Sequence, residues 1–353
     1  MLTILAFIFV LGIAILFHEF GHFITAKLSG IKVFRFSLGF GPKIAGFFWK
    51  GTEYSLCLFP FGGYVKMAGE MANNENYENK EISTEEYIPE KQRFDKKSFF
   101  VRALVIVNGP IMNIVLALLL LIIVFYFSGI AQVSNTISNV ADESPAAKAG
   151  ILSGDKIISI DSTIIENAEE ISEMINQKKD EIVTIRLRRN NYSFVTKIVP
   201  EYNTEYERAM IGITLEVNIK NLTFFQSVSK SIGMIGEIIH LIGRGFLEMF
   251  TGKMPIELAG PLGIAQMAGE AAQVGFLNLL FFTAVINIFL GIINLFPIPI
   301  LDGGQIFLLA IEKIRGKPLE PEHVNFIYIV GLTLVVMIFL IATYQDILRI
   351  FTK

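Results

Sequence analysis

Four stretches of this chain are long and apolar enough to cross the hydrocarbon core of a bilayer, which takes about 20 residues of helix. The composition agrees, because 52% of the residues are hydrophobic and only 18% are charged, a balance that soluble proteins rarely show. The sequence therefore predicts an α-helical polytopic membrane protein with four transmembrane helices. The predicted spans are approximately Leu2–Ile24, Ala103–Phe127, Phe276–Leu301 and Val324–Thr343.

Two other apolar features need separate interpretations. The first span is predicted to be retained rather than cleaved as a signal peptide, because Met1–Phe17 contains no Lys or Arg. A fifth apolar stretch, Phe224–Phe250, carries charged and polar residues at helical spacing along one face. That pattern favours a helix on the membrane surface or against the other spans rather than one that crosses the bilayer.

The basic residues predict an orientation. The segment Lys27–Arg102 is rich in Lys and Arg, and residues 313–317 add three more basic side chains. The positive-inside rule places both segments in the cytoplasm and both chain ends outside, although Arg349 and Lys353 argue the other way. A net charge of −3 argues against a nucleic-acid partner, and the single cysteine, Cys57, cannot form an internal disulfide.

A soluble module is predicted between the second span and the fifth apolar stretch. Ser144–Ile151 reads as a small-residue helix, and Ser153–Asp161 as a tight turn that enters a strand. Two strand-like runs separated by Asn190–Asn191 predict a hairpin. This β-rich segment resembles a PDZ domain of the prokaryotic type, and the predicted orientation places it outside the cytoplasm.

The segment Gly30–Ala68 is predicted to form a membrane-associated β region, because polar and apolar residues alternate and glycines interrupt the runs. Non-helical backbone at membrane depth requires burial in protein or a watery cavity. Four parts are therefore expected: a membrane half at 1–130, a PDZ-like α+β domain at 131–202, a linker with a surface helix at 203–275, and a second membrane half at 276–353.

The pentapeptide His18-Glu19-Phe20-Gly21-His22 carries the strongest chemical signal. Residues four apart share one helix face, so both imidazoles can reach one metal ion, while Glu19 can act on a water molecule beside it. The alternative is two histidines packed by chance in an apolar helix. Ionisable groups inside a span are costly, however, and are functional candidates for that reason.

A catalytic zinc usually takes three protein ligands, so a third ligand is expected elsewhere. Asp302 follows the third span within Asn294–Gly304, and spans one and three run in the same direction. Pro297 and Pro299 break the helix there, which can present Asp302 to a metal. The alternative makes Asp302 the N-cap of the next helix.

These motifs together resemble the site-2 protease family, in its bacterial RseP-like branch. The resemblance rests on HEFGH in the first span, NGPIMN (Asn108–Asn113) in the second, the PDZ-like module and NLFPIPILDGG (Asn294–Gly304). It implies zinc held by His18, His22 and Asp302, with Glu19 as general base.

The resemblance extends to substrate binding. It suggests that Asn294 holds the substrate backbone or the oxyanion, and that Gly39 and Gly41 belong to a strand region that pairs with unwound substrate. The role of the NGPIMN motif stays open between a functional role, as its match to the family motif suggests, and close packing of helices. Two departures stand out: Phe289 replaces an asparagine of many members, and there is room for one PDZ-like module only.

The expected function is zinc-dependent endoproteolysis in or near transmembrane segments. The resemblance implies single-span membrane protein substrates, such as trimmed anti-sigma factors or remnant signal peptides, and a location in the bacterial cytoplasmic membrane with the active site towards the cytoplasm. Membrane lipid and a peptide C-terminus at the PDZ-like module are further expected partners. The alternatives are an adaptor without chemistry and a metal transporter, which would carry ligands along several spans.

Overall fold

The computed structural model describes residues 1–70, 88–165, 168–204, 206–252 and 259–352. These residues form two compact units. One unit combines Met1–Tyr126 with Thr223–Lys353, and the other, called the inserted module below, is Phe127–Leu222. Each unit is described by itself.

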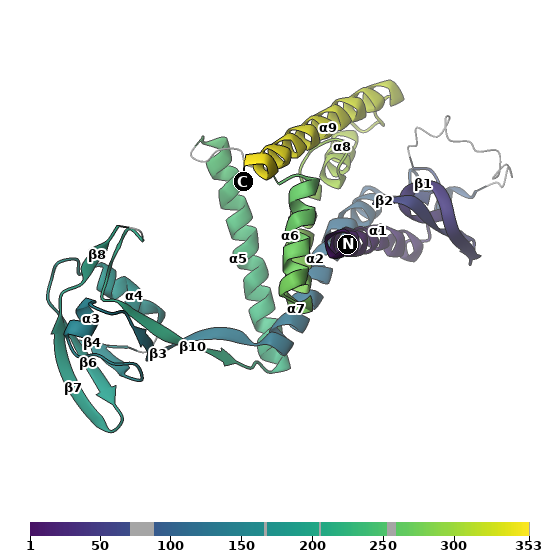
Figure 1. Cartoon of the computed structure of the whole chain (residues 1–353). Helices are drawn as coiled ribbons and strands as arrows, with labels where there is room; N and C mark the ends of the chain where they lie inside the picture. The colour runs from purple at the N-terminus through teal and green to yellow at the C-terminus, as the bar shows by residue number, and fades with distance from the viewer. Residues whose placement is uncertain (71–87, 166–167, 205, 253–258, 353) are drawn as a thin grey trace. The chain divides into compact units, whose positions relative to one another are not determined.

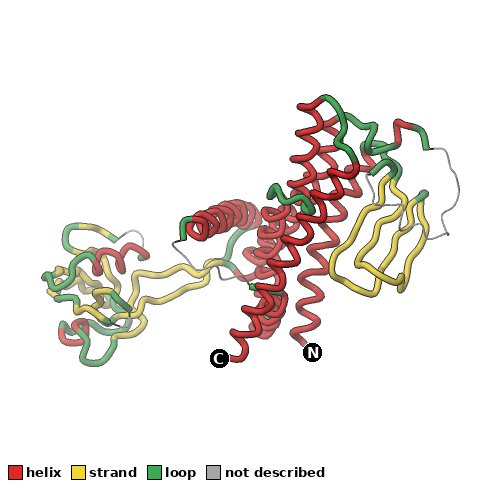
Figure 2. Tube along the Cα trace, turned by 90° about the horizontal axis from the view of Figure 1, so that it is seen from above, coloured by secondary structure: helices red, strands yellow, loops and turns green. Residues whose placement is uncertain are grey.

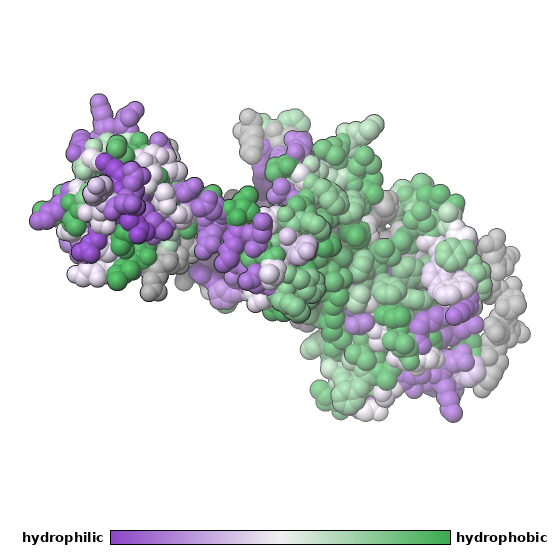
Figure 3. All heavy atoms as spheres, turned by 90° about the horizontal axis from the view of Figure 1, so that it is seen from below, coloured by the Kyte–Doolittle hydropathy of each residue, from purple (hydrophilic) through white to green (hydrophobic). Residues whose placement is uncertain are grey.

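Four described helices of the first unit are long and apolar enough to cross a membrane, at the four predicted places. They are α1 (Leu2–Leu28), α2 (Phe99–Ser128), α7 (Phe276–Asn294) and α9 (Pro321–Thr352). Many of their large apolar side chains are exposed, and apolar surface covers the helices in Figure 3. Because lipid is as apolar as these side chains, such exposure fits a membrane-embedded unit.

Three further described helices belong to this unit. They are α5 (Phe224–Phe250), α6 (Pro261–Val274) and α8 (Asp302–Arg315). Helix α5 has the predicted bounds, and a capping box formed by Thr223 and Gln226 fixes its start. Helix α6 packs against α1 and α7 through a small cluster of buried side chains (Figure 1). The members of that cluster are Ala6, Val10, Ala268 and Leu279.

Helix α7 ends at Asn294, before the predicted end at Leu301, so the last part of the predicted span is wrong. The proline pair at 297 and 299 explains the earlier end, since proline cannot donate the backbone hydrogen bonds that continue a helix. The chain then turns, and α8 begins at Asp302. A β-carbon on Gly303 would lie 2.2 Å from the Leu295 carbonyl oxygen, so only glycine allows this tight turn.

The predicted β region is present as two long antiparallel strands, β1 (Val33–Trp49) and β2 (Thr52–Met67), each of which bends back on itself (Figure 2). Residues 33–38 pair with 63–67 on one side and with 53–56 on the other, and the stretch 52–57 pairs in turn with 43–49. The stretch 63–67 is therefore an edge. Phe23 of α1 packs against Phe36 and Val65 of this sheet.

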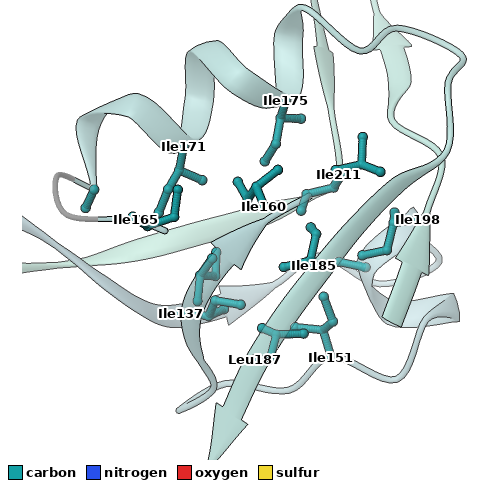
Figure 4. Packing of buried hydrophobic residues seen from close by; sticks show 14 residues of the cluster. Ile137, Ile151, Ile160, Ile165, Ile171, Ile175, Ile185, Leu187, Ile198 and Ile211 are labelled. Carbon is teal, nitrogen blue, oxygen red and sulfur yellow. The ribbon is translucent and has the colours of Figure 1, made fainter. Parts of the chain in front are cut away.

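The inserted module has its own core of buried isoleucine, leucine, valine and alanine side chains (Figure 4). Its main sheet has the order β10-β3-β4-β6-β7, with β5 beside β4, and β8 pairs with β9. The predicted hairpin is the pair β6–β7, which turns at residues 190–191. The module extends beyond the range 131–202 on both sides, because β10 pairs along the length of β3.

The elements of the module are β3 (Ile130–Val140), α3 (Pro145–Lys148), β4 (Lys156–Ile160), β5 (Thr163–Ile164), α4 (Glu169–Asn176), β6 (Val183–Arg189), β7 (Tyr192–Ile198), β8 (Glu201–Asn203), β9 (Arg208–Met210) and β10 (Ile213–Lys220).

Candidate metal centre

Three predicted residues come together inside the first unit. His18 and His22 lie one turn apart on α1, and Asp302 is the first residue of α8. His18 Nε2 lies 3.2 Å from Asp302 Oδ2, His22 Nε2 lies 3.5 Å from Asp302 Oδ1, and the two Nε2 atoms are 3.3 Å apart. Among the described residues this is the one group of three such side chains that could hold a metal ion.

These distances suit a tetrahedral metal. Zinc bonds of about 2.0–2.1 Å to nitrogen and oxygen place neighbouring ligand atoms about 3.3–3.4 Å apart. Asp302 Oδ2 is buried and has no hydrogen-bond partner in the described part of the chain. A buried carboxylate oxygen without a hydrogen bond is costly, and a cation between the three side chains would remove that cost. The donor set therefore fits zinc.

Asp302 does not act as a helix cap. Leu301 occupies the N-cap position of α8, and the N-cap makes no side-chain hydrogen bond to the helix. The alternative reading of Asp302 is therefore wrong. The break after α7 instead directs the carboxylate towards the two imidazoles of α1.

Helix α2 lies very close to the histidine pair, and glycine makes that approach possible. A β-carbon on Gly109 would lie 2.3 Å from His22 Nε2, and one on Gly21 would lie 2.2 Å from the Asn108 carbonyl oxygen. Asn108 also donates to the Gly21 carbonyl and to the Thr25 hydroxyl. Part of the NGPIMN motif thus serves close packing of α1 and α2.

Glu19 follows His18 on α1 and is half-buried. The edge of β2 passes directly beside it. A β-carbon on Gly63 would lie 2.8 Å from Glu19 Cγ, so the absence of a side chain at Gly63 is what allows strand and helix to approach this closely. A carboxylate beside the metal centre and next to a free strand edge can exchange protons with groups bound there.

The three weaker site predictions lie in distinct places. Asn294 is the last residue of α7, and its side-chain amide makes no hydrogen bond among the described residues. Gly39 and Gly41 form the bend of β1, both with positive φ, and pack against Phe59. Their glycine identity is explained by this bend, and a role in substrate binding stays a prediction for all three.

The remaining histidines lie outside this centre. His240 is exposed on α5, and His323 is exposed beside Glu320 at the start of α9, with 3.3 Å between His323 Nδ1 and Glu320 Oε2. Neither belongs to the group of ligand atoms formed by α1 and α8.

Sequence reasoning assigned no partner to the second nitrogen of either imidazole. His22 Nδ1 lies 2.9 Å from the Val105 carbonyl oxygen, and His18 Nδ1 lies 3.4 Å from the Asn113 amide. A metal-bound histidine almost always donates its other N–H to such a group. That rule, applied to a polar residue within a predicted span, could have pointed to Asn113 from the sequence, but it was not applied there.

Comparison with known proteins agrees with this chemistry. The model of peptidase family M50 matches residues 6–338. A Clostridium acetobutylicum protein whose name describes a zinc metalloprotease is 34% identical over 98% of this chain and 96% of its own length. The regulator of sigma-W protease RasP of Bacillus subtilis is 28% identical over 99% of both chains.

A PDZ domain is among the solved structures that match part of this chain. The PDZ domain of an SdrC-like protein from Listeria monocytogenes shares 27% identity, covers 24% of this chain and 86% of its own chain, and gives a TM-score of 0.22.

Proposed function

This chain belongs to peptidase family M50, as a membrane-embedded zinc metalloprotease of the site-2 type, and we propose that it cuts other membrane proteins within or next to their transmembrane segments. The observation that carries this proposal is the convergence of His18, His22 and Asp302 on one point, with Glu19 beside them. A soluble protease has no need to build such a site from membrane-spanning helices.

We propose that His18 Nε2, His22 Nε2 and the Asp302 carboxylate hold the zinc. When bound, the ion supplies polarisation of the scissile carbonyl and a lowered pKa for the attacking water. Glu19 takes the proton of that water and passes it to the leaving amine. Asn294, whose amide has no partner among the described residues, is placed in this proposal to donate to the substrate carbonyl.

The edge of β2 at residues 63–66 is the proposed binding site for the substrate backbone, because the Met67 N–H already donates to Glu70 Oε2. A transmembrane helix satisfies its own backbone hydrogen bonds and must unwind before hydrolysis. Residues 63–67 pair with 33–38 on one side only, and Gly63 lies against Glu19. A substrate strand added at this edge regains the hydrogen bonds lost on unwinding and brings its scissile bond beside the general base.

Location and substrates are also part of the proposal. The distribution of Lys and Arg supports a bacterial cytoplasmic membrane protein with its metal centre towards the cytoplasm and its module outside. The proposed substrates are single-span proteins already trimmed by another protease, such as anti-sigma factors or remnant signal peptides. The Bacillus subtilis relative, named as a regulator of sigma-W, supports the first class. The module would bind a substrate C-terminus or exclude bulky proteins.

The test uses Glu19→Gln in the full-length protein, purified in detergent and mixed with a single-span model substrate. Cleavage should be lost while zinc content and thermal unfolding stay at wild-type values, because the amide cannot take a proton but is not a proposed ligand. Glu237→Gln, on the exposed side of α5, is the matched control and should cleave normally. Undiminished cleavage by Glu19→Gln would overturn the assignment.

A further inference from the structure

The metal-facing atom of His18 is Nε2, and this fixes what its other ring nitrogen must do. Nε2 lies 3.2 Å from Asp302 Oδ2 and 3.3 Å from His22 Nε2. A neutral imidazole carries one N–H, so a lone pair on Nε2 that faces a metal places the proton on Nδ1. His18 Nδ1 is then a donor within the membrane and needs a buried acceptor.

Asn113 supplies that acceptor. The side chain is 1% exposed on α2, and its amide nitrogen Nδ2 lies 3.4 Å from His18 Nδ1. Its oxygen, Oδ1, is buried without a hydrogen-bond partner among the described residues. A half-turn of an asparagine amide exchanges its nitrogen and its oxygen, and the hydrogen-bond partners around the group decide which orientation it takes. The half-turn pairs the orphaned oxygen with the ring N–H.

The same helix holds the second imidazole in the same way. His22 Nδ1 lies 2.9 Å from the Val105 carbonyl oxygen. Val105, Gly109 and Asn113 follow each other at intervals of four residues, so they share one face of α2. Gly109, in the middle, leaves the space that the two rings fill.

From this geometry we propose that Asn113 is a positioning residue for the zinc ligand His18. Its Oδ1 accepts the Nδ1–H, holds the ring in the tautomer that presents Nε2 to the metal, and fixes the ring plane. This inference rests on the proposed function, because it takes His18 as a zinc ligand. Removal of such an outer partner typically weakens metal affinity by about 10–100-fold.

The experiment measures the zinc dissociation constant of the full-length protein in detergent by competition with a chelating dye. Asn113→Leu keeps the size of the side chain and removes the acceptor, so its zinc affinity should fall by about 10–100-fold. Asn113→Asp keeps an acceptor at the same place and should restore affinity to within about tenfold of wild type. With zinc at saturation, Asn113→Leu should lower kcat more than it raises KM, because the ring plane is no longer fixed.

The matched control is Asn287→Leu. Asn287 is also a fully buried asparagine within a span, and its Oδ1 has no hydrogen-bond partner among the described residues, but its amide donates to the Thr283 carbonyl on its own helix. Its zinc affinity should stay at the wild-type value. If Asn113→Leu does not fold, as judged by thermal unfolding of the metal-free protein, Asn113→Ser decides, since its short hydroxyl cannot reach His18.

His18→Ala separates this inference from the proposed function. Wild-type zinc affinity in His18→Ala would overturn the proposed ligand set itself. Loss of zinc in His18→Ala together with wild-type affinity in Asn113→Leu would overturn the role of Asn113 alone. Weak binding in Asn113→Leu that Asn113→Asp does not repair would also overturn it, because the acceptor would not be the cause.

Discussion

At the scale of single residues, the metal centre depends on glycines that leave space as well as on the side chains proposed to bind the metal. Gly109 lets α2 approach both imidazoles, Gly63 lets the edge of β2 reach Glu19, and Gly303 lets the chain turn into α8. In each case a methyl group would stand within 3 Å of an atom of the site or of its backbone. These positions are therefore sensitive to the smallest substitution.

Gly109→Ala tests this dependence on space. The added methyl would lie 2.3 Å from His22 Nε2, so the ring must leave its present position or α2 must shift. Overpacking of this kind costs about 1–3 kcal/mol. We expect zinc content after gel filtration to fall well below one ion per chain, and the thermal unfolding temperature to drop.

Gly12→Ala on α1 is the control, because nothing lies within 4 Å of a β-carbon there. It should keep its zinc, and its stability should rise slightly, since alanine favours a helix over glycine by about 1 kcal/mol. Equal zinc retention in both variants would show that contact at Gly109 does not control the site.

At the scale of helices and strands, the sequence predicted what local patterns determine. The apolar stretches placed the four long helices, and the spacing within HEFGH placed both histidines on one face. The shared direction of spans one and three also predicted that Asp302 lies near the C-terminal part of α1, where HEFGH is. The third span was predicted to run to Leu301 because apolar residues continue on both sides of the two prolines, but α7 ends at Asn294, ahead of the break expected at Pro297 and Pro299.

Contacts between helices were harder to predict. Which side chains of α2 face α1 depends on the rotation of each helix about its axis, and a nearly uniform apolar surface does not reveal it. The role of Asn113 therefore required the structure, although its motif had been recognised.

The attachment of α9 to α6 provides a prediction at this scale. Asp346 of α9 is 2% exposed, and its carboxylate accepts the backbone N–H groups of Gly260 and Gly263 at 3.1 and 2.8 Å. These N–H groups belong to the start of α6, where a helix has unpaired donors and favours negative charge.

Asp346→Ala should lower stability by about 1–3 kcal/mol, the cost of unpaired buried donors, and Asp346→Asn should have a smaller effect. Thermal unfolding of the purified protein measures both. Thr343→Ala, which removes only an exposed hydroxyl bonded within α9, should be close to neutral. If Asp346→Ala unfolds at the wild-type temperature, the contact does not hold the two helices together.

The ion pair between Asp155, just before β4, and Arg189, at the end of β6, predicts that the stability of the inserted module depends on pH. Asp155 is fully buried, which by itself would raise its pKa, but the Arg189 guanidinium at 2.7 Å and the Leu152 N–H outweigh burial and hold the pKa below its ordinary value. A carboxyl with a lowered folded-state pKa stabilises the fold at pH values above the unfolded pKa of about 3.9. That contribution is lost as pH falls through the folded pKa.

The isolated module, residues 127–222, has its own core and serves for this measurement. Its unfolding temperature should fall as the pH drops below the unfolded pKa of about 3.9, and Asp155→Asn should be less stable at pH 6 and should lose most of that dependence. The exposed Asp142→Asn should keep the wild-type profile. A profile unchanged by Asp155→Asn would assign the acid sensitivity to other groups.

At the scale of the whole molecule, the metal centre is assembled from two distant parts of the chain with the inserted module between them. His18, His22, Asn113 and Asp302 all lie in the unit formed by Met1–Tyr126 and Thr223–Lys353. The four-part division of the sequence stays a prediction, and the inserted unit in the structure is Phe127–Leu222. Strand β10 pairs with β3 over a long range of sequence, and such pairing leaves little trace in local patterns.

That pairing allows the module to be removed cleanly. Strands β3 and β10 run side by side, with Ile130 opposite Lys220 and Val133 opposite Val217. Because the paired ends are neighbours, an Asn-Gly turn can join Val133 to Val217 in place of residues 134–216, since this dipeptide favours tight hairpins. The shortened chain keeps every proposed ligand and the general base.

We expect the shortened protein to bind zinc within about threefold of the wild-type affinity, which is less than 1 kcal/mol, because the module contributes no residue to the centre. It should also cut a single-span substrate that lacks an extracytoplasmic domain. Against a substrate with a large folded extracytoplasmic domain, cleavage should rise if the module excludes bulky proteins, and we expect that rise. Loss of zinc from the shortened protein would instead make the module part of the folding unit of the metal centre. Unchanged discrimination between the two substrates would place substrate selection in the unit that holds the metal centre rather than in the module.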